Sequence, residues 1–311
     1  MNPLRNRATR IQSRKGSASA PAPLDALAAL SQPDGYAAFL QATLPQQQRG
    51  VARHAFGGRR VWLKKAGPRH GKLGYHLLAA IAGTLRLDVL TPVPNPGGEA
   101  AVAIEARRLR ALGALGLRVP TVLAQQADGL LISDLGEGGQ APVVLNERLD
   151  HAAAVGPKAL LTVWREGLDA IALVHAHGTY LSQAFARNLM HCPDGTIGYI
   201  DFEDDPGDTL ALPDCQVRDW LSYLHSTAAL VHAASPHAAG AHWHAVLADA
   251  SDAVRERLEH AARRMRWLRH LPASRRWGRD TQRVRAVALL LARWYATGYD
   301  PATRPAPIAR K

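Results

Sequence analysis

The spacing of apolar residues along the chain predicts a strand-rich first half and a helix-rich second half. Apolar residues recur at helical spacing over residues 99–115, 159–175 and 281–295, and each stretch is long enough for several turns. Short runs rich in Val, Ile and Leu, bounded by turns with glycine, are typical of strands and occur at 59–65, 122–123, 130–136 and 197–200. The pattern therefore predicts an α+β protein.

Charge and composition separate the two ends from the body of the chain. The 311 residues have a formal net charge of +12, with five basic residues and no acid in 1–21, and fifteen basic against five acidic residues in 251–311. Residues 1–34 are rich in Arg, Ser, Ala and Pro without a sustained apolar period, which predicts a disordered basic tail, and 301–311 forms a second basic tail. Basic ends favour contact with an anionic surface, lipid or nucleic acid, although a solvated arginine-rich surface has the same composition.

The cysteine count and the absence of a secretory apolar segment indicate a cytoplasmic protein. Cys192 and Cys215 are too few for a disulfide framework and have no partners at metal-binding spacing. This low usage suits a reducing compartment. The first 34 residues contain no secretory apolar stretch.

Two apolar or aromatic segments are candidates for contact with an anionic membrane. The segment 72–90 is apolar but holds Arg86 and Asp88, and spanning a bilayer takes roughly 20 apolar residues. We expect it either to lie in a membrane interface or to pack as a helix on the strand-rich half, and we favour packing. The tryptophans of the arginine-rich segment near the C terminus could lie in a membrane interface, stack on nucleotides or pack into the helical half. We again favour packing, for Trp267, Trp277 and Trp294.

A loop and the hairpin after it carry the candidate metal chemistry. Gln183 precedes Asn188 by five residues and Asp201 by eighteen, and Asp201 directly follows the β-type run 197–200. A carboxamide and a carboxylate can each bind magnesium, and the ions then neutralise charge on a phosphoryl group in transfer. Asn188 and Asp201 thus have oxygen atoms of the kind that magnesium binds.

Two lysines end the strand 59–65, and the helix 99–115 carries a candidate acidic partner for one of them. Because side chains alternate along a strand, Lys64 and Lys65 point to opposite sides of it. Glu105 in the helix is the candidate partner of that lysine, and its alternative is an exposed i to i+3 pair with Arg108.

These residues, in this order, resemble the protein-kinase-like superfamily, especially its atypical bacterial members of the lipopolysaccharide-kinase (Kdo/WaaP) and RIO-like type. The sequence V-W-L-K at 61–64 is similar to V-A-I-K, residues 183–188 to D-x-x-x-x-N, and residues 201–203 to D-F-G. The likeness covers roughly residues 50–230. It implies a bilobal fold with a small β-rich N-lobe at 35–136, in which 72–90 is an insertion, and a helical C-lobe at 137–300.

The resemblance also implies roles for single residues in a site for ATP and Mg²⁺. Asn188 and Asp201 would be the metal ligands, and strand alternation leaves Lys65 as a competitor of Lys64 for the phosphates. Lys64 would bind the α- and β-phosphates with Glu105 orienting it, and the backbone from Ser133 to Leu135 would contact adenine, unless that segment is a simple strand end. Asp219 would brace the catalytic loop, although an aspartate near a helix start is also an ordinary cap.

The sequence departs from the kinase pattern at the catalytic base. Gln183 stands where the pattern has its aspartate, and glutamine has no useful basicity. Glu203, Asp204 and Asp205 follow closely, and one of them could replace the base, because neighbouring carboxylates raise one another's pKa. A solvated acidic turn is the alternative. Trp62 stands where the pattern has a small residue beneath adenine.

Two function classes follow from this sequence. The first is an atypical ATP- and Mg²⁺-dependent phosphotransferase that acts on a protein or an envelope saccharide at the inner face of the membrane. The second is a catalytically weak or inactive pseudokinase that binds nucleotide as a regulatory module at the same surface. A basic nucleic-acid binder is a third hypothesis, but we do not expect nucleic acid as the partner.

Overall fold

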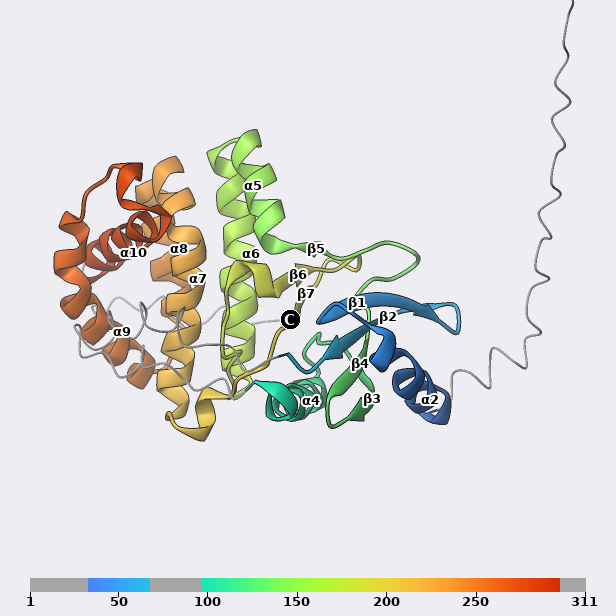
Figure 1. Cartoon of the computed structure of the whole chain (residues 1–311). Coiled ribbons are helices and arrows are strands. Elements are labelled where there is room, and N and C mark those ends of the chain that lie inside the picture. Colours follow the sequence, from blue (N-terminus) through green and yellow to red (C-terminus); the bar gives the residue numbers. More distant parts are fainter. Residues whose placement is uncertain (1–32, 68–96, 297–311) are drawn as a thin grey trace, which may run out of the picture.

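The protein has a mixed α+β fold, as the apolar pattern predicts. A computed structural model describes residues 33–67 and 97–296, and it places a four-stranded sheet on one side and a group of long helices on the other (Figure 1). The predicted insertion at 72–90, the basic tail at 301–311 and all but the last two residues of the tail at 1–34 lie outside the described residues. Within the described ranges, no helix is long and apolar enough to cross a membrane.

The four-stranded sheet fixes which way the two candidate lysines face. It is antiparallel, in the order β1 (Val51–Phe56), β2 (Arg59–Lys65), β4 (Gly129–Ser133) and β3 (Val122–Gln126). Lys64 pairs with Leu130 and Lys65 with Gly129. Because successive side chains of a strand alternate, the two lysines lie on opposite faces.

One face of the sheet is covered by α2 (Pro33–Thr43) and the short 3-10 helix η1 (Leu44–Gln46). The prediction of a disordered tail to residue 34 is therefore wrong for its last two residues. A proline fits the first position of a helix because its missing N–H has no partner there. The apolar stripe that packs is narrow, with one residue every four, which makes the helix hard to recognise. Its buried cluster comprises Tyr36, Leu40, Leu44, Val61, Leu63 and Leu131.

The other face of the sheet contacts α4 (Gly98–Ala114), which confirms the helix predicted at 99–115. Leu130 and Ile132 of β4 belong to the same buried cluster as Val102, Ala106 and Leu109 of α4. Lys64 therefore lies on the α4 side of the sheet and Lys65 on the α2 side.

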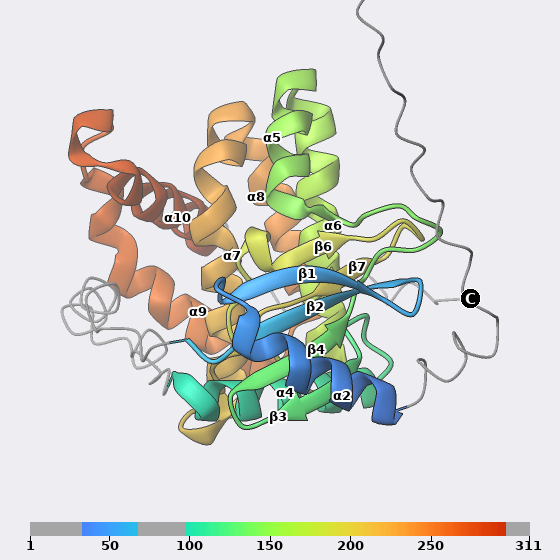
Figure 2. The ribbon, with the colours of Figure 1, turned by 45° about the vertical axis from the view of Figure 1, so that its right-hand side comes forward.

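A second, small sheet lies between the first sheet and the long helices (Figure 2). It has the order β5 (Val143–Val144), β6 (Leu189–His191) and β7 (Ile197–Tyr199), all antiparallel. The strand predicted at 197–200 is confirmed with one residue fewer. The β6–β7 hairpin carries Asn188 at one end and Asp201 at the other.

The helical part has a core of aromatic residues. Its helices are α5 (Leu145–Val155), α6 (Pro157–Ala176), α7 (Leu212–Ala234), α8 (Pro236–Leu247), α9 (Asp252–Met265) and α10 (Arg279–Ala296). Trp164 of α6 stacks on Tyr223 of α7, with ring centroids 6.4 Å apart. Trp243 of α8 meets Trp220 and Trp294 edge to face. These contacts join α6, α7, α8 and α10.

The predicted packing of three tryptophans is correct for one of them. Trp294 is buried, but Trp267 is 53% exposed and Trp277 is 66% exposed, so the prediction is wrong for these two. In the 3-10 helix η5 (Arg266–His270), Leu268 takes the buried position, which leaves its neighbour Trp267 outside.

A glycine in α6 allows the close approach of α7 and gives a test of the packing. A Cβ atom at Gly167 would lie 2.6 Å from the Tyr223 ring carbon Cζ and 2.8 Å from Leu145. We expect Gly167→Ala to lower the free energy of unfolding by about 1–3 kcal/mol, because overpacking outweighs the better helix propensity of alanine. Urea denaturation measures the change.

Gly240→Ala in α8 is the matched control. There the nearest atom to a new Cβ is Arg293 Cδ at 3.5 Å, an ordinary contact, so this variant should keep or gain stability. Equal losses in both variants would contradict the packing of α6 against α7.

Candidate functional site

Lys64 lies at the centre of a charge cluster that joins the sheet, α4 and the segment after β7. Its Nζ atom is 2.5 Å from Glu105 Oε2, 3.2 Å from Glu203 Oε1 and 3.9 Å from Asp201 Oδ1. We call these four residues the Lys64 cluster. Lys65, on the opposite face, donates to the Gln47 carbonyl at 3.4 Å. The geometry therefore selects Lys64 from the two candidates.

Glu105 is the partner of Lys64, and the alternative of an exposed pair with Arg108 is wrong. Glu105 is only 3% exposed, whereas an i to i+3 surface pair requires solvent-facing side chains. Arg108 is also buried and donates to the Tyr180 carbonyl at 2.6 Å. The two side chains thus serve different parts of the site.

The Lys64 cluster has an excess of negative charge. Burial lowers the pKa of Lys64, but the carboxylates of Glu105, Glu203 and Asp201 together raise it by more, so the lysine stays charged. Burial raises the pKa of Glu105, and Lys64 offsets only part of that effect. Three carboxylates face one ammonium, and two of them belong to partly exposed side chains, so a cation from solvent would be stabilised here.

The β6–β7 hairpin brings Asn188 beside Asp201. The Ile200 amide donates to the Asn188 carbonyl at 3.0 Å, which places the residue after Ile200 next to the hairpin's first strand. The Asn188 side chain donates from Nδ2 to the Gln183 carbonyl at 3.0 Å, so its amide oxygen remains as a metal-type ligand. Asp201 has a φ of +74°, a backbone conformation that is uncommon outside glycine. Residues with such strained backbones are often found at functional sites.

The hard oxygen atoms of Asn188 and Asp201 fit magnesium. Mg²⁺ is usually held by one or two carboxylates together with phosphate oxygens, and it keeps several waters. In the described ranges there is no group of three or more His, Cys, Asp or Glu side chains placed to hold a metal by themselves. An ion on this pair alone would take most of its ligands from water or from another molecule.

Asp219 braces the loop that contains Gln183, as the sequence predicts. Its Oδ2 atom accepts from the Leu181 amide at 2.7 Å and lies 3.1 Å from His175 Nε2. The alternative of a helix cap is wrong, because α7 begins at Leu212 and Asp219 lies fully buried in its interior. Ser182, the next residue after Leu181, is buried with a φ of +82°.

Two arginines of α4 tie this helix to the other side of the site. Arg107 lies 2.9 Å from Asp205 and 3.4 Å from Asp208. The Arg108 guanidinium lies 4.2 Å from the centre of the Tyr180 ring and also binds the Tyr180 carbonyl. The sequence pattern indicates Arg108 only as a surface partner of Glu105, and gives no indication of Arg107 or Tyr180. The helical phase gives one signal, since Arg108 follows Glu105 by three residues and so shares its buried face.

The three carboxylates nominated as a replacement base have different surroundings. Glu203 binds Lys64, and Asp205 binds Arg107 and the Tyr180 hydroxyl. Asp204 accepts a hydrogen bond from Gln183 Nε2 at 2.8 Å and is 1% exposed. The alternative of a solvated turn is therefore wrong for Asp204 and Asp205, and Asp204 is the one bonded to the residue at the base position.

The segment nominated for adenine is held by the sheet. The Ser133 amide donates to the Thr121 carbonyl at 2.9 Å, and its hydroxyl accepts from the Thr121 amide at 2.8 Å. The Trp62 indole donates to Asp134 at 2.8 Å. The Leu135 carbonyl accepts from Arg118 at 3.5 Å. The Ser133 amide is therefore already hydrogen-bonded to the segment at Thr121. An adenine contact at Leu135 stays a prediction.

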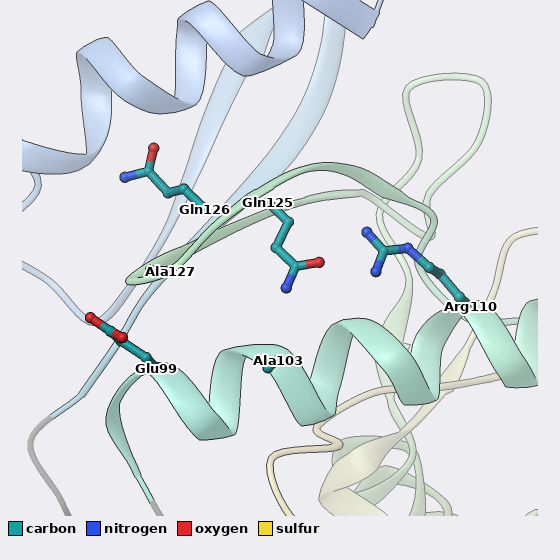
Figure 3. A pocket seen from close by; sticks show the side chains of 6 residues that line it. All are labelled: Glu99, Ala103, Arg110, Gln125, Gln126 and Ala127. Carbon is teal, nitrogen blue, oxygen red and sulfur yellow. The ribbon is translucent and has the colours of Figure 1, made fainter.

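A pocket of about 520 Å³ lies between α4 and β3 (Figure 3), and none of the residues that line it belongs to the Lys64 cluster. Ala103 lines it, and because Ala103 and Glu105 are two residues apart they lie on opposite sides of the helix. Its lining lacks both the lysine and the carboxylate excess of the Lys64 cluster. We therefore assign the chemistry to the cluster. The pocket is lined by Glu99, Ala103, Arg110, Gln125, Gln126 and Ala127.

Taken together, the cluster and the hairpin can hold an anionic group with a divalent cation. Lys64 offers the positive charge, and Asn188 and Asp201 offer the oxygen ligands. No protein-family model matches the sequence, and no curated protein matches it. The geometry of these residues is therefore the basis for assigning a function.

Separate substitution of each lysine by methionine tests the placement of Lys64 in the cluster. We expect Lys64→Met to lower the free energy of unfolding by about 3 kcal/mol, because it leaves the buried Glu105 carboxylate without its cation. Lys65→Met, on the other face, should change stability by less than about 0.5 kcal/mol. Urea denaturation of both variants gives the values, and equal effects would contradict the placement of Lys64.

The pH dependence of stability tests the burial of Asp204. Burial raises its pKa, so the folded protein keeps this proton to higher pH than the unfolded chain does. The stability from the protonated carboxyl is present below the unfolded pKa of about 4 and is lost as pH rises through the folded pKa. The melting temperature of Asp204→Asn should therefore rise relative to the parent between about pH 4 and pH 7.

Asp194→Asn is the control for this measurement. Hydrogen bonds from Thr196 lower the pKa of Asp194, so its contribution is lost only as pH falls through a pKa below the ordinary value. The control should show no such rise between about pH 4 and pH 7. A constant difference between Asp204→Asn and the parent would show that Asp204 is not buried as described.

Proposed function

We propose that the chain is an atypical kinase-like phosphotransferase that uses ATP and Mg²⁺. The observation that carries the proposal is the buried pair of Lys64 and Glu105, with Nζ 2.5 Å from the carboxylate and facing Asp201. Three segments far apart in the sequence meet at this point. Their order and the contacts between them agree with the resemblance of the sequence to protein kinases.

The arrangement of the elements supports a bilobal fold for this activity. The four-stranded sheet with α2 and α4 would form the small lobe, and α5 to α10 would form the helical lobe (Figure 1). The β6–β7 hairpin lies between them and carries the metal-ligand candidates, so the nucleotide phosphates would bind between the lobes.

Each residue of the site has a role in this proposal. Lys64 binds the phosphates, and Glu105 holds its ammonium group in place. Asn188 and Asp201 hold Mg²⁺, which when bound supplies positive charge against the phosphate oxygens. Asp219 keeps the loop backbone fixed through the Leu181 amide. The acceptor would be a hydroxyl group of a protein or an envelope saccharide, which is what the resemblance implies.

A pseudokinase is the second candidate, and one observation favours it. Glutamine cannot accept a proton at neutral pH, and the nearest carboxylate, Asp204, is almost fully buried. In this case the cleft would bind nucleotide and Mg²⁺ as a regulatory module without turnover.

Nucleotide binding and turnover, measured side by side, separate the two candidates. A ligand present at 100 times its Kd stabilises a protein by about 2.7 kcal/mol, so saturating ATP with Mg²⁺ should raise the melting temperature by several degrees. Asp201→Asn should lose most of this shift, and Asp194→Asn, in the hairpin turn, should keep it. We expect release of ADP from the parent at a measurable rate.

The outcomes have distinct meanings. A thermal shift without ATP turnover would favour the pseudokinase over the enzyme. A shift in Asp201→Asn equal to that of the parent would reject the assigned metal site, and the absence of any shift in the parent would reject both candidates.

A further inference from the structure

We propose that Asp204 fixes the side-chain amide of Gln183 so that the side-chain oxygen, Oε1, accepts a hydrogen bond from the acceptor hydroxyl. Gln183 is then a positioning residue for the hydroxyl group and not its base. This inference rests on the proposed phosphotransferase function and explains how transfer proceeds without the usual aspartate.

The contact between the two side chains determines which end of the amide is available. Gln183 Nε2 donates to Asp204 Oδ2 at 2.8 Å. Because this bond uses the NH₂ group of the amide, the side-chain oxygen of Gln183 points away from Asp204. Gln183 is partly exposed and Asp204 is 1% exposed, so solvent and substrate approach from the Gln183 side.

The backbone around Gln183 holds the amide at a fixed place beside the metal-ligand candidates. The backbone carbonyl of Gln183 accepts from Phe185 N at 2.8 Å and from Asn188 Nδ2 at 3.0 Å. On its other side, Leu181 is bound to Asp219 and Ser182 is buried in a left-handed conformation. With both neighbours held, the side chain loses little additional freedom when a substrate binds.

The contacts argue against Asp204 as the proton acceptor in this state. A general base must come within about 2.6–3.2 Å of the proton-bearing atom, or reach it through one water. Asp204 is closed off from solvent, and one of its oxygens is occupied by the Gln183 amide. A hydroxyl group would meet Gln183 first.

Phosphoryl transfer can proceed with positioning alone because its transition state is loose. The bond from the γ-phosphorus to ADP breaks early, and the bond to the acceptor oxygen forms late, so the hydroxyl group need not lose its proton beforehand. The products are ADP and the phosphorylated acceptor. The hydroxyl proton leaves after transfer, to the new phosphate group or to water. An oriented hydroxyl group is therefore the main requirement.

The experiment uses the full chain with ATP, Mg²⁺ and water as the acceptor hydroxyl. We expect Gln183→Ala to lower kcat for ATP hydrolysis by about 10- to 100-fold, because the acceptor is no longer held in line. The KM for ATP and the thermal shift with ATP and Mg²⁺ should stay as in the parent, since no nucleotide contact is lost. Asp204→Asn should lower kcat by a smaller factor. An asparagine side chain can donate as well as accept a hydrogen bond, so it would hold the Gln183 amide in either of two orientations, and only one of them presents the oxygen to the hydroxyl.

A matched control and the opposite results keep the test decisive. Asp194→Asn makes the same chemical change in the hairpin turn and should leave kcat as in the parent. A higher kcat in Gln183→Ala would show that Gln183 shields a true base, and an unchanged kcat would show that it has no part in the step. Either result overturns the proposal while the phosphotransferase function stands.

Failures of the proposed function are visible separately. A parent that binds ATP with Mg²⁺ but does not hydrolyse it overturns the positioning role and leaves a nucleotide-binding module. A parent that shows no thermal shift overturns the proposed function itself, and the positioning role with it. If Asp204→Asn does not fold, Gln183→Ala, at a partly exposed position, still decides the question.

Discussion

The buried ion pair of Lys64 and Glu105 is the interaction on which the rest of the site depends. It joins β2 to α4, and α4 then reaches the other half of the protein through Arg107 and Arg108. A shift of α4 would therefore move the lysine partner, the acidic turn and the Tyr180 backbone together. Since the pair is nearly closed to solvent, breaking it on one side leaves a charge that water cannot easily reach.

The excess of carboxylates around Lys64 has a physical cost, and in the proposed function this cost would give the site its selectivity. Like charges that share a small volume destabilise each other, and Asp201 holds its place in a left-handed backbone conformation. A bare anion would be repelled by Asp201 and Glu203, whereas an anion that arrives with a divalent cation would relieve the repulsion. A proposed metal–phosphate ligand would therefore bind here in preference to free phosphate.

Sequence patterns predict the parts of the site that depend on spacing, and miss those that depend on tertiary contacts. Strand alternation narrows the lysine to two residues, and helical phase nominates Glu105, so both could be named in advance. The likeness to V-A-I-K nominates Lys64, but strand alternation alone cannot choose it over Lys65 without knowing which face of the sheet α2 covers. The apolar stripe of α2 is too narrow for that helix to be recognised. The bond between Gln183 and Asp204 joins residues 21 positions apart, and no periodicity reports such a contact.

Burial, more than residue type, decides what the acidic turn can do. Glu203, Asp204 and Asp205 are adjacent carboxylates, yet one binds Lys64, one binds Gln183, and one binds Arg107 with Tyr180. A carboxylate that is closed off and already bonded to an amide acts on the site by orienting that amide. In the proposed function, Gln183 would therefore still provide a means of holding a hydroxyl group, because a glutamine bonded through its NH₂ group presents its oxygen in a defined direction. How well that oxygen is placed depends on how rigidly the loop from Leu181 to Asn188 is held, and its bonds to Asp219 and the β6–β7 hairpin hold it at both ends.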